Sequence, residues 1–510
     1  MLRPSRKQDT PTKRSNTDES KSRRKVRNRI KKSQGCQPAL LGLITVAFLL
    51  AGWAELSGLG GGNKKTSVRW DDPGHSTTKG LVARTALFPA APEFDTDGKT
   101  RLHVVFSTDC GDFQHWQSYL LFFSAMKVGQ PGRVTRIASG CTDEESAAAT
   151  AWHEEHVTKG MSDKFGLHLT PHFSSVTKDG KEVGNYKFFN KPHGLKHWLE
   201  HGEGMGVDPA TGKLLDEDLV VILTDPDMLF LRPIGADFSN KEEYLFFPRK
   251  DNEKQKYRVE HGSPFAQRYG YGGVWQKSDL TKISGEGSPA ISVTPEEARF
   301  YYPAGPPYIA TGRDMYSIAQ KWSEFVPLVH AQRPELLAEM YAYSIAAAHL
   351  ELPHQLIDSL MLTQAKAKIE ASEFIDKIPA AGVCEFAAHP DSTKYTLPNV
   401  VHFCQRYFVG EWFFSKRRTP KDFFTCESPL FEIPPSDLGE NFHYQIPPGN
   451  KHNEEDPKEK ISPQMAKREA FIICALVSGM NEAATFFKKN HCDGIEGTRT
   501  DKSLNLFSTF

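Results

Sequence analysis

The stretch that decides the fold is VVILTDPD, residues 220–227. Its first four residues are a continuous apolar run, which is typical of a central parallel strand covered on both faces of a sheet. Two carboxylates, Asp225 and Asp227, follow at the end of that run. Residues i and i+2 of an extended segment point to the same side, and open α/β sheets bind ligands at the carboxyl ends of their strands. The stretch therefore predicts an α/β fold with an acidic site at one sheet edge.

Apolar strand patterns and helical patterns alternate on both sides of this stretch, which predicts one α/β domain over residues 101–435. A segment rich in Gly and Pro, residues 285–307, is expected to be a loop. Residues 436–510 are expected to form a charged linker, a helix capped by Ser462, and a disordered end. The expected strands are 102–108, 134–138, 219–223, 308–310 and 400–403, and the expected helices are 114–127, 185–201, 335–350 and 463–490.

The charge of the chain is balanced as a whole but not along its length. The 510 residues contain 63 Lys/Arg and 63 Asp/Glu, so the net charge is zero, which argues against a nucleic-acid partner. Residues 1–32 carry a net charge of +10, so the remainder carries −10. Hydrophobic residues at 39% and charged residues at 25% exclude a collagen-like, a wholly disordered or a multi-spanning membrane protein.

An apolar segment, residues 38–54, directly follows the basic arm and contains no charge before Glu55. It is at the short end of what spans a bilayer as a helix, and the basic residues before it place the N-terminus in the cytosol. We therefore expect a cytosolic tail at 1–37, a single-pass type II signal anchor at 38–54 and a stem at 55–100. Short anchors suit early secretory membranes, so we expect a catalytic domain in the Golgi or endoplasmic reticulum lumen.

Two alternatives compete with a signal anchor. A signal peptide could be cleaved near Ala54, but its charged region is normally much shorter than this basic arm. The arm could also be a nuclear-localisation or nucleic-acid-binding segment, although the adjoining apolar run favours a membrane.

Eight cysteines are too few for a disulfide scaffold, and no Cys-x-x-Cys pair is present. Cys36 lies at the expected membrane edge, which leaves seven cysteines on the lumenal side. We expect one to three disulfides among them and, because seven is odd, at least one cysteine outside a disulfide.

The acidic pair is a candidate metal site. Hard cations such as Mn²⁺ and Mg²⁺ prefer oxygen ligands, and Asp225 and Asp227 supply them. His402, at the end of a late apolar strand, is suited to be a further ligand. Taken alone, an Asp-x-Asp motif is weak and a buried histidine is more often structural; the apolar strands before them favour a functional interpretation.

Basic residues near the ends of other elements could bind phosphate. Lys191 lies at a helix start, where backbone N–H groups favour anions. Lys416, Arg417 and Arg418 follow the late strand and could neutralise phosphates, or could form a solvated basic loop.

Three further motifs are more typical of structure than of chemistry. A histidine stripe at helical spacing resembles a surface face because it lacks His-Glu-x-x-His. A His-Glu-Glu-His segment has the wrong order for a zinc helix and is expected on an exposed face. A Gly-rich segment lacks the Gly-Lys-Ser/Thr of a phosphate loop, although it could line a substrate pocket. The stripe consists of His193, His197 and His201, the His-Glu-Glu-His segment is 153–156, and the Gly-rich segment is 269–273.

Six co-linear blocks over about residues 100–430 resemble the plant and algal hydroxyproline O-arabinosyltransferases and the related peptidyl-serine α-galactosyltransferases. Residues 248–285 and those after 435 match no block of these families, so they leave the choice of acceptor open. The blocks are HVVFSTDCGDFQHWQS (103–118), VTRIASG (134–140), FNKPHGLKHWL (189–199), VVILTDPDMLFLRP (220–233), EMYAYSIAAA (339–348) and VVHFCQRY…GEWFFSKRR (400–418).

The resemblance implies a GT-A (Rossmann-like) fold and a UDP-sugar donor. It implies that Asp225, Asp227 and His402 hold Mn²⁺ or Mg²⁺ against the diphosphate, and that the nearby basic residues assist. It further implies nucleoside contacts and one catalytic carboxylate, although a retaining mechanism needs no obligatory general base. The implied phosphate contacts are Lys191, Lys416 and Arg417. The implied nucleoside contacts are Thr108 and Asp109, and the implied catalytic carboxylate is Glu339.

The expected function is O-glycosylation in the secretory pathway, with L-arabinofuranose transferred from a UDP donor to hydroxyproline of a peptide. Three alternatives stay open from sequence alone. They are transfer of galactose to serine, a non-catalytic lumenal module that binds nucleotide sugars, and a metal-dependent phosphoesterase that uses the same carboxylates.

Overall fold

The computed structural model describes Phe88 and residues 91–178, 180–248, 255–367, 370–440, 462–493 and 499–506. The predicted cytosolic tail, the predicted anchor and most of the predicted stem lie outside the described residues. The same holds for most of the predicted charged linker.

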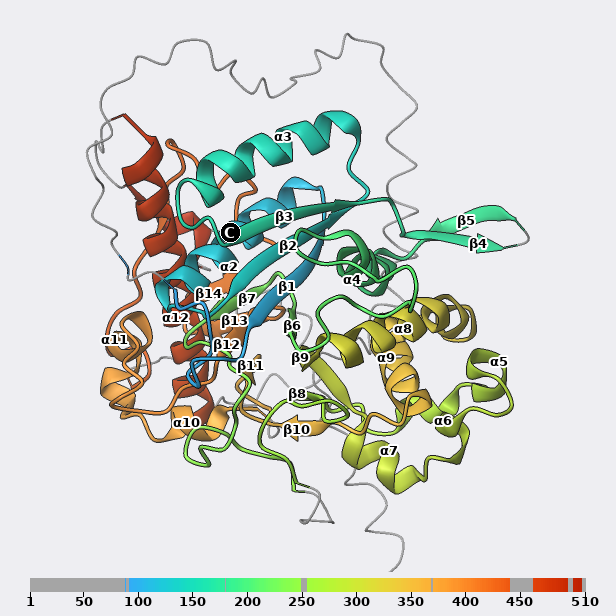
Figure 1. Ribbon diagram of the computed structural model, residues 1–510. Coiled ribbons are helices and arrows are strands. Elements are labelled where there is room, and N and C mark those ends of the chain that lie inside the picture. The colour runs from blue at the N-terminus through green and yellow to red at the C-terminus, as the bar shows by residue number, and fades with distance from the viewer. Residues whose placement is uncertain are drawn as a thin grey trace, which may run out of the picture. The chain divides into compact units, whose positions relative to one another are not determined.

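A seven-stranded mixed sheet forms the centre of the fold (Figure 1). Strand β9 runs antiparallel to both of its neighbours, and the other neighbouring strands of this sheet are parallel. The α/β class predicted from the sequence is confirmed, although β6 has one antiparallel neighbour. The strands, in spatial order, are β10 (Gln355–Ile357), β8 (Phe265–Arg268), β9 (Ala304–Thr311), β6 (Val220–Thr224), β1 (Leu102–Asp109), β2 (Arg133–Ser139) and β3 (Phe165–Thr170).

Helices cover both faces of this sheet because alternate residues of each strand point to opposite sides. Val104 of β1 packs into one apolar cluster with α2 (Asp112–Lys127) and α12 (Pro463–His491). Val105 packs into a second cluster on the other face. The helices of that second face are α4 (Asn190–His201), α8 (Gly312–Gln332) and α9 (Ala338–His349).

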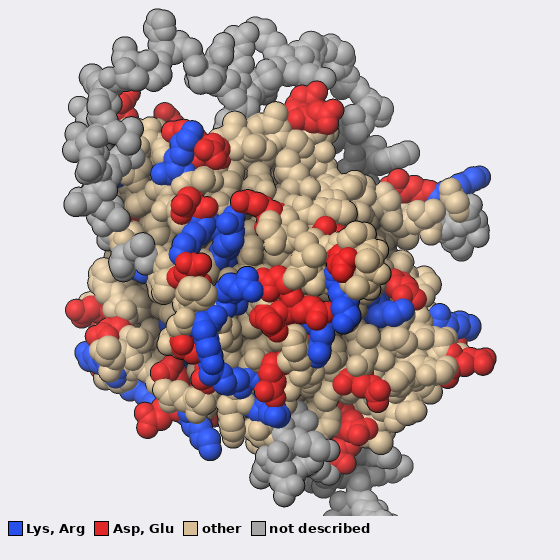
Figure 2. Space-filling model, viewed as in Figure 1, with Lys and Arg blue, Asp and Glu red and all other residues tan. Residues whose placement is uncertain are grey.

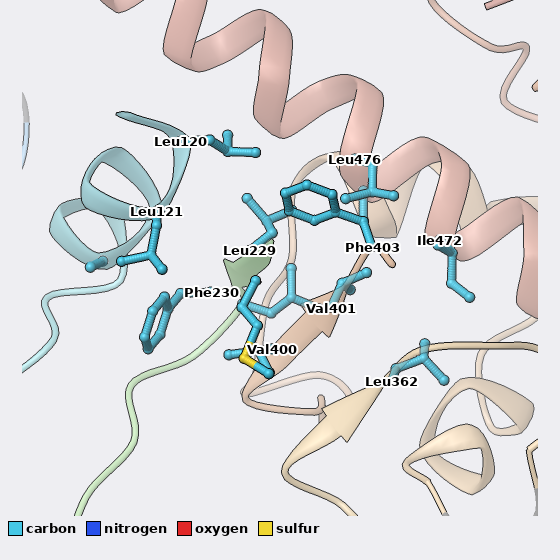
Figure 3. Packing of buried hydrophobic residues seen from close by; sticks show 14 of the residues in the cluster. Leu120, Leu121, Leu229, Phe230, Leu362, Val400, Val401, Phe403, Ile472 and Leu476 are labelled. Carbon is cyan, nitrogen blue, oxygen red and sulfur yellow. The ribbon is translucent and has the colours of Figure 1, made fainter. Parts of the chain in front are cut away.

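A second sheet of three short strands continues from the first. Strand β7 (Met228–Phe230) follows β6 after a short turn and pairs antiparallel with β12 (Val400–His402), which pairs parallel with β11 (Met361–Leu362). Figure 3 shows Phe230, Val400 and Val401 packed together in this sheet.

The remaining described elements are short. Each predicted strand and helix coincides with an observed element. The short elements are α3 (Asp143–His153), η1 (Glu154–Thr158), β4 (Ser175–Lys178), β5 (Lys181–Asn185), η2 (Lys187–Phe189), η4 (Val274–Lys277), α5 (Leu280–Ser284), α6 (Pro289–Ser292), α7 (Pro295–Tyr301), α10 (Ser372–Asp376), η5 (Ala380–Gly382), α11 (Val383–Ala388), β13 (Arg406–Val409), β14 (Trp412–Ser415), β15 (Leu430–Phe431), β16 (Thr500–Asp501) and η7 (Lys502–Leu504).

Helix α12 is part of the hydrophobic core. Its Ser462 accepts a hydrogen bond from the Met465 N–H, which is the expected N-cap. Figure 3 shows Leu476 beside Phe403, next to the small sheet. At Gly479 a Cβ would lie 3.0 Å from a methyl carbon of Leu229, so the helix approaches β7 closely at this glycine.

Length and composition also make α12 the one helix among the described residues that could cross a membrane. In the protein, 72% of its most apolar window is buried, which is typical of a core helix.

The described residues contain three disulfides. Cys384–Cys474 joins α11 to the middle of α12, and Cys426–Cys492 joins the segment after β14 to the C-terminal end of α12. Cys110–Cys141 joins the segments that follow β1 and β2. Cys404 is outside these disulfides. Both cysteine predictions, one to three bridges and at least one cysteine outside them, are confirmed for the described residues.

Two predictions of irregular structure are wrong. The segment 285–307 contains α6 and α7, because Pro289 and Pro295 occupy the first helical position after the capping residues Ser288 and Thr294. Residues 499–506 are ordered, since β16 pairs with β15 and Leu506 forms a β-bridge with Trp412.

The packing of α12 predicts the effect of shortening Leu476, which is fully buried. We expect Leu476→Ala to lower the free energy of unfolding by about 2–5 kcal/mol, because it leaves a cavity beneath the small sheet. Urea denaturation of the purified chain measures this change. The matched control is Leu215→Ala at a site that is 67% exposed, where we expect a change within about 0.5 kcal/mol. Equal effects of the two substitutions would mean that α12 is not part of the core.

Candidate active site

Asp225, Asp227 and His402 lie together at the carboxyl edge of the central sheet. One ligand atom from each residue lies within 4.8 Å of the others. The register of the small sheet explains this, because His402 of β12 pairs with Met228, the residue after Asp227. The Phe403 N–H also donates a hydrogen bond of 2.9 Å to the carbonyl oxygen of Asp227. The strand pairing therefore brings His402 to the acidic pair.

This donor set suits a hard or borderline divalent cation. The Nε2 atom of His402 lies 3.3 Å from Oδ1 of Asp227 and 3.8 Å from Oδ2 of Asp225. Two carboxylates and one imidazole match the oxygen-rich sets that hold Mn²⁺ or Mg²⁺. Asp227 and His402 are buried and Asp225 is partly exposed, so an ion here would be open to a ligand on one side.

Lys416 reaches this group from the end of β14. Its ammonium forms an ion pair with Oδ2 of Asp227. Burial alone would raise the pKa of Asp227, but Lys416 and His402 hold that pKa well below its usual range, so the carboxylate stays ionised. Burial opposes the charge of Lys416 as well, yet Asp227 raises the pKa of Lys416. The neighbouring Arg417 is exposed, and its backbone N–H donates to the hydroxyl of Ser415.

Lys191 connects the acidic pair to Glu339. Its Nζ lies 2.7 Å from Oδ1 of Asp225 and 3.3 Å from Oε1 of Glu339. Lys191 is the second residue of α4 and Glu339 the second residue of α9, so the first turns of two helices meet at this point. Burial opposes the charge of Lys191, but Asp225 and Glu339 together raise its pKa above the usual value. On the face shown in Figure 2, acidic side chains gather near the centre with basic side chains on either side.

Glu339 is a buried carboxyl group of this site whose pKa is raised rather than lowered. Its side chain is 3% exposed. Burial raises the pKa of Glu339 to about 7, with Lys191 opposing the rise and Asp225 adding to it. A carboxyl group with such a pKa can carry either a charge or a proton near neutrality, which is a property of catalytic groups.

Thr108 and Asp109, predicted from the resemblance to contact the nucleoside, lie at the end of β1. The Thr108 hydroxyl accepts a 2.9 Å hydrogen bond from Nε of Arg136, and Asp109 pairs with Lys187 at 2.9 Å. Burial lowers the pKa of Arg136 to about 10, against the opposing effect of Asp109. The structure thus places Thr108 and Asp109 on the same sheet edge as Asp225, but beside other cations.

Sequence reasoning did not find Arg136, Lys187 or Tyr186. Arg136 is a charged residue within the predicted strand 134–138, and this charge was the signal that could have found it. Tyr186 donates a hydrogen bond of 2.9 Å from its hydroxyl to the Leu336 carbonyl and accepts one of 3.1 Å from the Glu339 N–H. It thereby holds the start of α9, and no local pattern in the sequence indicates this.

Two of the motifs set aside from sequence are structural. His153 is buried and bonds the Phe165 carbonyl at 3.1 Å, so the expectation that the whole of 153–156 forms an exposed face is wrong. The imidazole of His153 can be buried because the backbone carbonyl of Phe165, in the adjacent β3, accepts its hydrogen bond. Tyr271, in the Gly-rich segment, is buried and donates a hydrogen bond of 2.7 Å to the Ala304 carbonyl.

Comparison with known proteins agrees with the site. The chain is 24% identical over 379 residues to a peptidyl serine alpha-galactosyltransferase of Arabidopsis thaliana, and the alignment covers 72% of this chain and 37% of that protein. A peptidyl serine alpha-galactosyltransferase of Chlamydomonas reinhardtii is 30% identical over 139 residues, covering 27% of this chain and 15% of that protein. The resemblance predicted from the sequence motifs is confirmed. The matched region is well under half the length of either relative.

Two other comparisons add little. No family model matches the chain. The apo structure of the bifunctional glycosyltransferase WbbM aligns with 63% of this chain and 47% of that chain, at 10% identity and a TM-score of 0.28, a value too low to argue for a shared fold.

The geometry of the acidic group predicts the effect of removing its imidazole. We expect His402→Ala to weaken Mn²⁺ binding at least about tenfold. Mutation of residues that only hydrogen-bond to a metal ligand commonly lowers metal affinity by that factor, so loss of a ligand should cost no less. Isothermal titration of the purified chain with Mn²⁺ measures the affinity. His389→Ala removes an exposed histidine outside the group and serves as the control. Equal Mn²⁺ affinities of the two variants would exclude His402 as a ligand.

Proposed function

We propose that this chain is a metal-dependent glycosyltransferase that moves a sugar from a UDP donor to a hydroxyl group of a peptide. The observation that carries the proposal is the group of Asp225, Asp227 and His402 at the carboxyl edge of the sheet, placed between Lys191 and Lys416. The similarity to peptidyl serine alpha-galactosyltransferases supports this assignment. The mixed sheet with one antiparallel strand supports a GT-A type of fold.

The charge balance of the site favours a diphosphate ligand held through a cation. Among the residues that the structure describes, Asp225, Asp227 and Glu339 form ion pairs with two ammonium groups, those of Lys191 and Lys416. Mn²⁺ or Mg²⁺, when bound, would act as a Lewis acid that offsets the negative charge developing on the departing UDP. Lys191 pairs with Asp225 and Lys416 pairs with Asp227, and each lysine could also contact a phosphate oxygen.

Glu339 is the residue proposed to act closest to the reacting sugar. It is buried beside Lys191, and its raised pKa allows it to hold a proton or to stabilise positive charge. A retaining transfer needs no general base, so the proposed role is stabilisation of positive charge on the sugar or orientation of the acceptor hydroxyl. Tyr186 would maintain this position through its hydrogen bond to the Glu339 N–H.

The names of the curated relatives favour galactose as the sugar and serine as the acceptor. The second candidate is transfer of L-arabinofuranose to hydroxyproline, favoured by the sequence blocks that resemble the arabinosyltransferases. The basic arm, the apolar segment 38–54 and the three disulfides support a type II protein of the Golgi or endoplasmic reticulum with its catalytic domain in the lumen.

The proposal predicts sugar transfer to a peptide. The purified chain is incubated with Mn²⁺, UDP-galactose or UDP-arabinofuranose, and peptides that contain serine, hydroxyproline or alanine at one position. We expect the mass of the serine peptide or of the hydroxyproline peptide to increase and the mass of the alanine peptide to stay the same. The Asp225→Asn variant is expected to transfer no sugar.

Other results of this assay identify the other classes of protein. Binding of UDP without transfer from either donor would favour a non-catalytic module. Release of phosphate from the donor without any change in the peptide would favour a phosphoesterase.

Glu339→Gln tests the proposed catalytic carboxyl group while preserving its size. We expect kcat to fall about a hundredfold or more, a loss typical of removing a group that stabilises charge in the transition state, while Mn²⁺ affinity is unchanged. The control is Glu335→Gln, which alters an exposed residue paired with Arg333 just before α9. A kcat within about threefold of the unmodified chain would remove Glu339 from the catalytic machinery.

A further inference from the structure

A cluster of histidines, separate from the acidic site, lies at the C-terminal end of α4, the end opposite Lys191. His197 and His201 are one turn apart on this helix, and their ring centres are 4.7 Å apart. The structure adds a third histidine that the helical spacing could not show. Nε2 of His168, on strand β3, lies 2.9 Å from Nδ1 of His197. The ring centres of His168 and His197 are 5.1 Å apart.

His193, the remaining member of the stripe predicted from sequence, has a different environment. Its ring stacks on Phe173 at 5.2 Å. The ring of Phe173 also lies 6.4 Å from that of His197. The difference is that His197 is additionally in hydrogen-bond contact with His168, whereas His193 stacks on Phe173.

We propose that His168, His197 and His201 bind a divalent ion of the zinc class at a site separate from the acidic group of Asp225. Imidazole is a preferred ligand of zinc, with Zn–N distances of about 2.0–2.1 Å. In tetrahedral geometry two such nitrogens are about 3.3–3.4 Å apart. The nitrogens of His168 and His197 need to separate by only about 0.5 Å from their present 2.9 Å.

Both histidines of the pair are partly buried. Burial, together with the nearby His197 and His201, lowers the pKa of His168 to about 4, and burial and His201 lower the pKa of His197. Each ring has a nitrogen that now faces the other ring and could bind an ion in its place. The hydrogen now shared between the rings moves to the other nitrogen of its own ring when the ion takes its place.

His201 supplies the third ligand from an exposed position. Its side chain is 61% exposed, so it is free to turn its ring toward the pair. Oε2 of Glu200 lies 4.0 Å from Nε2 of His201, and Oε1 of Glu200 accepts a hydrogen bond of 3.0 Å from the Tyr316 hydroxyl. A carboxylate fixed beside a histidine ligand is a common way to orient the ring for a metal.

An ion at this site would join α4 to β3 directly. Lys191, at the start of the same helix, pairs with Asp225 and Glu339. The ion is therefore proposed to be structural and to hold in place the helix that presents Lys191.

The test measures zinc bound to the full chain after treatment with a chelator and equilibrium dialysis against Zn²⁺. We expect the unmodified chain to bind two ions. Each of the single variants His168→Gln and His201→Gln is expected to bind one ion, or to bind the second with at least tenfold lower affinity. His193→Gln is the matched control and is expected to bind two. Asp225→Asn is expected to lose the other ion and keep this one.

A second readout uses Co²⁺ in place of zinc. Co²⁺ at the histidine site is expected to give a visible absorption band that is lost in His201→Gln, whose exposed position leaves folding unchanged, and kept in His193→Gln. The proposal is wrong if Asp225→Asn, which keeps all three histidines, binds no Zn²⁺. It is equally wrong if His168→Gln and His201→Gln bind Zn²⁺ as the unmodified chain does. Neither result depends on sugar transfer, so the proposed function is tested separately.

Discussion

The antiparallel pairing of β7 with β12 is the constraint on which the candidate site depends. It places His402 opposite Met228 and next to Asp227, although these segments are far apart in the chain. The short strands cannot maintain this pairing alone, because two- and three-stranded sheets need an apolar partner. Helix α12 provides it, with Leu476 near Phe403 and Gly479 in close approach to Leu229. The C-terminal helix is thus a structural requirement of the acidic site.

Electrostatics imposes a second condition on the same site. Burying Asp227 and Glu339 without partners would cost several kcal/mol for each ion, so each needs a cation nearby. Lys416 comes from the β13–β14 hairpin and Lys191 from α4, so two separate elements must dock before the charges are compensated. The proposed transfer uses the same two lysines. They compensate the buried carboxylates and also lie where the diphosphate is expected to bind.

Local patterns predicted most strands and helices because their apolar residues recur with the period of the element. The errors have physical causes in particular residues. Pro289 and Pro295 suggested a loop but begin helices, since proline is accommodated at the first helical position. Thr108 and Asp109 were correctly expected at a strand end, but their bonds to Arg136 and Lys187 depend on the neighbouring β2 and on η2. The helical stripe was set aside because it lacks His-Glu-x-x-His, and it could not indicate His168, which belongs to strand β3 and not to α4.

Sequence by itself determined the α/β class, the acidic pair at the end of a buried strand, and the resemblance to peptide glycosyltransferases. These properties depend on the order and character of residues close together in the chain. Tertiary structure alone decided that Lys191 bridges Asp225 and Glu339, that α12 supports the site, and that His168 joins His197. The physical reason is that such contacts follow from strand register and helix docking between distant segments, whose geometry no local period of the sequence records.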